Sequence, residues 1–121
     1  MLNNFANAKI INVQRWQKMK ENEMICKIFI RTFPSTEECD LFESILQTRW
    51  PSLLDGTKGV SFKAYRNDQS PHVSTVVWVF PDQTTQKKVE GLIETHIKKF
   101  TNTLSPKTIT FTGKQTIALS T

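Results

Sequence analysis

Polar and aromatic side chains that suit a ligand-binding site alternate along residues 24–33. Lys27, Phe29 and Arg31 are two positions apart from one another, and residues two apart in a β-strand point to the same face of a sheet. An aromatic ring between two cationic side chains can hold and orient a small amphipathic molecule. The spacing therefore predicts a ligand-binding face that carries Lys27, Phe29 and Arg31.

Tyr65, His72 and Trp78 complete the predicted site. Trp78 lies in a second β-forming segment, residues 73–80, and we assign it to the same sheet face as Phe29, with Tyr65 and His72 near the mouth of the site. A pocket of aromatic rings with a few titratable groups can deprotonate a small substrate without a cofactor. Ordinary structural roles also explain each of these side chains, so whether the protein is an enzyme stays open.

The sequence contains no motif that identifies a reaction. Its four glycines do not cluster into a phosphate-binding loop, and HExxH, GxSxG and Walker patterns do not occur. Cys26 and Cys39 are thirteen positions apart with no histidine close by, which favours free thiols in a reducing compartment over a metal site or a disulfide. We therefore predict no metal and no cofactor.

The composition indicates one folded domain. The chain has 121 residues, of which 38% are hydrophobic and 22% charged, enough for one core, so we treat residues 1–121 as a single domain with its core over about 24–119. The net charge of +5 favours anionic partners only weakly, because acidic residues are mixed among the basic ones. No segment resembles a signal peptide or a membrane span of ~20 apolar residues, and we expect a cytoplasmic protein with no membrane partner.

Two strand-to-helix junctions organise the chain. Residues 24–33 and 73–80 are rich in β-branched and aromatic residues, which favours strands. A proline and a capping residue, Ser35 or Asp82, follow each of them. Apolar residues at helical spacing then predict two helices, over residues 36–49 and 83–101.

The remaining segments predict a hairpin and a last strand. Residues 60–66 alternate and are joined to the next strand by a turn-forming stretch, and residues 108–112 alternate before a predicted turn at Gly113-Lys114. We also expect an extra strand before residue 24, an end of the first helix at Trp50-Pro51, and burial of Trp50 with the leucines that follow it.

This order predicts an α+β, ferredoxin-like βαββαβ fold, with an antiparallel sheet and two helices on one of its faces. Alternation leads us to assign Cys26, Ile28 and Ile30 to the helix side. That assignment leaves the rings of Phe29, Trp78 and Phe80 on the second face, which is too aromatic to stay bare. We therefore predict a homodimer that buries the second face, with a small-molecule ligand in a cavity there.

The pattern resembles the dimeric α/β-barrel superfamily, which includes antibiotic-biosynthesis monooxygenases and stress-responsive barrel proteins of microbes. The resemblance covers residues 24–119, and its most suggestive element is VVWVFPD at residues 76–82, followed by an amphipathic helix. Haem-degrading members use an Asn on the first strand, a Trp on the third and a His on a helix. Trp78 and His96 fit that set, but residues 24–33 contain no Asn, so the resemblance does not extend to haem chemistry.

Two other functions stay open. RNA-recognition motifs share the βαββαβ order and stack bases on aromatic residues of their central strands, a role that Phe29, Trp78 and Phe80 would fill here. Residues 73–80 lack the basic-Gly-aromatic start of that motif, which disfavours nucleic acid as a partner. The other alternative is a structural or regulatory dimer without catalysis.

Overall fold

The fold is a four-stranded sheet with helices on one face. The computed structural model describes residues 24–121, and the predicted extra strand before residue 24 lies outside them. The strands pair in the order β2-β3-β1-β4, and every pairing is antiparallel. They are β1 (Ile25–Thr32), β2 (Ser61–Arg66), β3 (Val73–Phe80) and β4 (Lys107–Lys114).

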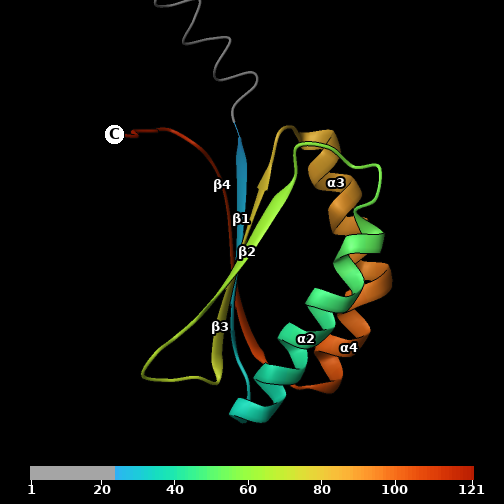
Figure 1. Ribbon diagram of the computed structural model, residues 1–121, viewed down its shortest axis with the longest axis vertical. Coiled ribbons are helices and arrows are strands. Elements are labelled where there is room, and N and C mark those ends of the chain that lie inside the picture. Colours follow the sequence, from blue (N-terminus) through green and yellow to red (C-terminus); the bar gives the residue numbers. More distant parts are fainter. Residues whose placement is uncertain (1–23) are drawn as a thin grey trace, which may run out of the picture.

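The helices cover a single face of this sheet (Figure 1). Helix α2 (Thr36–Leu53) follows β1, and the second helical segment consists of α3 (Gln83–Leu92), η1 (Ile93–Ile97) and α4 (Lys98–Thr103). This element order and sheet order confirm the predicted ferredoxin-like fold.

Both predicted helix starts are confirmed. The Ser35 side chain accepts a hydrogen bond from the backbone amide of Glu38 at 3.3 Å, and Asp82 accepts one from the amide of Thr85 at 2.7 Å. These bonds satisfy amides that have no partner within the first turn of a helix. The hydrogen bond to Asp82 also lowers the pKa of that carboxyl below its ordinary value.

The π-helical turn η1 was not predicted. In η1 the amide of Lys98 donates to the carbonyl of Ile93, an i→i+5 bond that takes in one residue more than an α turn. The extra residue is not evident in the sequence, because a regular amphipathic helix also allows apolar residues four apart, as Val89, Ile93 and Ile97 are.

Two predicted boundaries were wrong. Trp50 and Pro51 do not end the first helix, which continues to Leu53 because the buried ring of Trp50 holds its last turn against the core. The fourth strand does not turn at Gly113-Lys114, because its ladder with β1 continues to its last residue.

The predicted assignment of the sheet faces was also wrong. Phe29, Trp78 and Phe80 are buried on the helix side, while the alternate positions of Ile28 and Ile30 lie on the open side. The aromatic face packs against the helices because it offers more apolar area to bury. An RNA platform and a dimer interface built on these three rings are therefore both wrong.

Aromatic rings occupy the centre of the core. Trp78 stacks on Phe62 with ring centroids 4.6 Å apart, and Trp50 meets it edge-on at 4.6 Å. Leu53 and Leu54 pack against the same cluster. The predicted anchoring of the end of α2 to the core is confirmed.

An ion-pair cluster joins β2 to α2. Arg66 donates to Asp40 at 2.9 Å and to Glu43 at 2.8 Å, and the hydroxyl of Ser74 donates to the second oxygen of Glu43 at 2.6 Å. The hydrogen bond to Glu43 raises the pKa of Arg66 above its ordinary value. A base whose pKa rises on folding adds stability that is complete below its unfolded pKa and is lost only as the pH rises through the folded pKa, so the contribution of Arg66 is fully present at neutral pH.

Replacing Glu43 with glutamine is expected to lower the free energy of unfolding by about 1–2 kcal/mol, because the amide offers one acceptor to two donors and loses the charge. Urea denaturation measures the loss. Asp40→Asn is the matched control: Asp40 is 64% exposed against 26% for Glu43, so its loss should stay below about 0.5 kcal/mol. Equal losses for the two variants would contradict this interpretation of the cluster.

Candidate functional site

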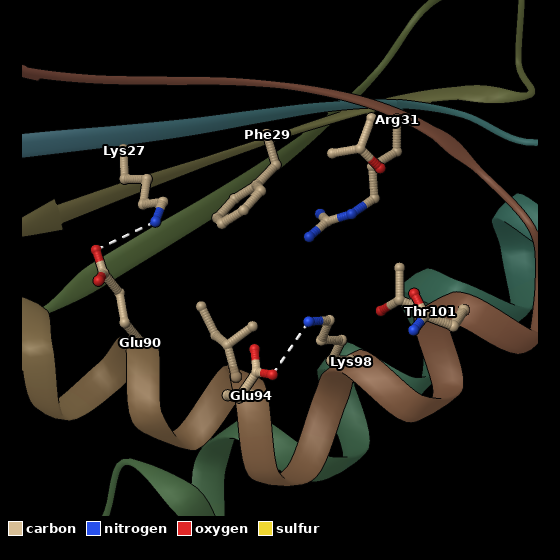
Figure 2. A pocket seen from close by; sticks show the side chains of 10 residues that line it. Lys27, Phe29, Arg31, Glu90, Glu94, Lys98 and Thr101 are labelled. Atoms are coloured by element: carbon tan, nitrogen blue, oxygen red, sulfur yellow. Dashed lines mark hydrogen bonds and ion pairs between the residues drawn. The ribbon is translucent and has the colours of Figure 1, made fainter.

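A cavity of about 350 Å³ lies between the helix side of the sheet and the second helical segment. Lys27, Phe29 and Arg31 project from β1 toward that segment (Figure 2). The volume of the cavity suits a small molecule. The other lining residues are Glu90 of α3, Ile93 and Glu94 of η1, Lys98, Thr101 and Asn102 of α4, and Thr108 of β4.

Both lysines of the cavity have carboxylate partners. The Lys27 ammonium lies 3.1 Å from a carboxylate oxygen of Glu90, and that of Lys98 lies 3.0 Å from Glu94. Figure 2 shows that the first pair bridges β1 and α3, whereas the second stays on the helical segment. Each pair balances its own charge, so neither lysine leaves a net charge on the cavity wall.

Within residues 24–121, Arg31 has no carboxylate partner. Its side chain is 6% exposed, and no ion pair or side-chain hydrogen bond joins it to any residue of 24–121. Its guanidinium carbon lies 4.4 Å from the ring centroid of Phe29 and 4.8 Å from that of Phe42, and its Nε is buried without an acceptor. Burial lowers the pKa of Arg31 to about 10, so the group remains charged at neutral pH.

The structure brings three of the six predicted site residues together and separates the others from them. Lys27, Phe29 and Arg31 line the cavity. Trp78 is buried in the aromatic core, and Tyr65 is exposed at a position of β2 that faces the open side. His72 precedes β3, where its carbonyl accepts the amide of Phe33 at 2.9 Å.

The helical half of the cavity was missed from the sequence. Glu94 and Lys98 show the i,i+4 spacing of an ordinary exposed ion pair, which gave no reason to single them out. Thr101 carried a usable signal, because it is a polar residue that continues the apolar stripe of the second helical segment. It is buried, and its hydroxyl donates to the carbonyl of Ile97 at 3.1 Å.

Residues 24–121 contain no cluster of three or more His, Cys, Asp or Glu side chains that is arranged to hold a metal ion. Cys26 and Cys39 are free thiols, and burial raises the pKa of the Cys39 thiol. None of the helices in residues 24–121 is long and apolar enough to cross a membrane.

Solved structures share this architecture at low sequence identity. A dimeric ferredoxin-like protein from an uncultured marine organism superposes with a TM-score of 0.69 at 15% identity, over 87% of this chain and 98% of that one. The present chain has the same ferredoxin-like fold. No family model matches the sequence, and no curated protein matches it either.

Two further solved structures, both of microbial proteins, share this fold. A conserved protein from Methanosarcina mazei has a TM-score of 0.62 at 12% identity and covers 82% of this chain and 99% of its own. SnoaB, a cofactor-independent oxygenase from Streptomyces nogalater, has a TM-score of 0.59 at 13% identity, with coverages of 80% and 97%. The fold that the sequence resemblance implied is confirmed.

Proposed function

We propose that this protein binds a small amphipathic molecule in the cavity between β1 and the second helical segment. The observation that carries the proposal is the cavity itself, in which Phe29 and Ile93 form an apolar wall and Arg31 and Asn102 supply polar groups. Ligand sites combine an apolar wall with polar groups that converge on the ligand, and this cavity has both, although most of its lining residues are polar or charged.

The protein functions, in this proposal, as a homodimer that buries the open side of the sheet. Ile30 is paired with Ile109 across β1 and β4, and Ile28 with Phe111. Ile30, Ile109 and Phe111 are exposed in the single chain, and a continuous apolar patch of this kind marks an interaction surface. The dimeric state of the marine neighbour and the apolar open side both support this assembly.

We place this dimer in the cytoplasm. Cys26 and Cys39 are both unpaired, which suits a reducing compartment.

Titration with 2-naphthoate and its neutral isostere 2-naphthamide tests the ligand site. At least one of these probes is expected to bind once per chain, as measured by calorimetry. Thr108→Trp should weaken that binding at least tenfold, because Thr108 is an exposed rim residue and the indole would fill the opening.

Leu41→Trp is the matched control, since Leu41 is an exposed residue of α2 that does not line the cavity. Its binding should equal that of the wild type. Failure of both probes to bind, or wild-type binding by Thr108→Trp, would overturn the proposed site.

A further inference from the structure

The charged residues of the cavity leave one positive charge uncompensated. Three cations and two carboxylates line it, and the two lysines are paired with the two glutamates. The remainder is the guanidinium of Arg31. A ligand that neutralises the charge of the cavity therefore carries one negative charge.

The contacts of Arg31 stabilise its charge without satisfying its hydrogen-bond donors. The rings of Phe29 and Phe42 lie within cation–π distance of the guanidinium carbon. Ring faces are poor substitutes for oxygen acceptors, and a buried charged group without acceptors is costly. Figure 2 shows the guanidinium directed into the cavity, so an acceptor placed there by a ligand would meet its N–H groups.

The nearby polar groups narrow the class of anion. The guanidinium fork matches the two oxygens of a carboxylate. A phosphate dianion would bring a second charge into a cavity that already holds Glu90 and Glu94. The hydroxyl of Thr101 is committed to a backbone carbonyl, so it does not add a further donor for phosphate.

We propose that the ligand is a small organic acid with a single carboxylate, held by Arg31, and a compact apolar body packed against Phe29 and Ile93. This inference rests on the proposed function of the cavity. A volume of about 350 Å³ is near the lower end of the range for ligand sites, which suits a body of one or two rings.

The two naphthalene probes have the same shape and differ in charge, so the difference in their affinities measures the effect of the carboxylate charge. Wild-type protein at pH 7 should bind 2-naphthoate at least tenfold more tightly than 2-naphthamide. Arg31→Met should abolish this preference by weakening naphthoate and leaving the amide unchanged, whereas Arg31→Lys should retain part of it. Lys58→Met removes the same charge from an exposed loop outside the cavity and should keep the full preference.

Thermal melting without ligand provides a second measurement. Because Arg31 is a buried charge with no hydrogen-bond acceptor among residues 24–121, Arg31→Met should melt at the same temperature as the wild type or higher. A lower melting temperature together with an unchanged naphthoate preference would assign Arg31 a purely structural role and overturn the inference.

The outcomes distinguish this inference from the function on which it rests. Equal binding of both probes to the wild type would overturn the selection of a carboxylate and leave the ligand site standing. If neither 2-naphthoate nor 2-naphthamide binds, both the proposed ligand site and the inference of a carboxylate ligand are overturned.

Discussion

Replacing Trp50 with alanine will lower the free energy of unfolding by about 3–5 kcal/mol. The ring is 1% exposed and lies between α2 and the aromatic residues Phe62 and Trp78, at centroid distances of 6.0 and 4.6 Å. Alanine leaves a void that the surrounding rings cannot close, because protein interiors are close-packed. Urea denaturation monitored by circular dichroism measures the loss, a large fraction of the ~5–15 kcal/mol that stabilises a domain.

A second substitution at the same position separates ring volume from hydrogen bonding. The indole Nε1 of Trp50 is buried without an acceptor in residues 24–121, so Trp50→Phe sacrifices no hydrogen bond and should cost clearly less than Trp50→Ala. Gln47→Ala, at an exposed position of the same helix, should stay within about 0.5 kcal/mol of the wild type. Equal losses for the phenylalanine and alanine variants would show that ring volume does not explain the effect.

Replacing Ile30 with aspartate will separate the proposed homodimer into folded monomers. Ile30 is 38% exposed in the single chain, so the new carboxylate stays hydrated in a monomer, whereas the dimer would bury it unpaired at a cost of about 3–5 kcal/mol. That cost raises the dissociation constant roughly 100-fold or more. Light scattering should show a fall from twice the chain mass to 14.0 kDa.

Leu41→Asp is the control for the dimer. Leu41 is also an exposed apolar residue, but it lies on α2, across the sheet from the open side. This variant should keep twice the chain mass. A wild-type protein of 14.0 kDa would overturn the dimer, and an Ile30→Asp protein that stays dimeric would place the interface elsewhere.

The fold was predictable because local signals agree along the chain. Ser35 and Asp82 follow β-rich segments and cap the helices where expected. Strand alternation also correctly grouped Phe29 with Trp78 and Phe80. The assignment of the other group to the helices was wrong, because a period of two defines which residues share a face and not what that face packs against. The face that packs against the helices is the one whose side chains fit helix residues such as Trp50. This fit depends on contacts between residues far apart in the sequence, which only the structure shows.

The candidate site was predictable on its β1 side alone. Lys27, Phe29 and Arg31 share a face through strand alternation, and the structure places all three on the cavity. Trp78 shares the same face, but β3 lies on the other side of β1 from β4, and its ring is enclosed by the core. The sequence pattern predicts which face of the sheet a residue lies on, but not how far its strand lies from the cavity. For this reason Trp78 was included in the predicted site.

The π turn η1 (Ile93–Ile97) affects the alignment of this chain with any relative that has a regular helix at this point. A regular α-helix rotates about 100° per residue, so residues eight apart would differ by about 80°, and residues seven apart by only about 20°. Yet Val89 and Ile97, eight apart, are both buried, and Glu90 and Lys98, also eight apart, both line the cavity. The wide turn absorbs one inserted residue. A relative with a regular helix here would be one residue shorter, and an alignment without that gap would misassign the positions equivalent to Lys98 and Thr101.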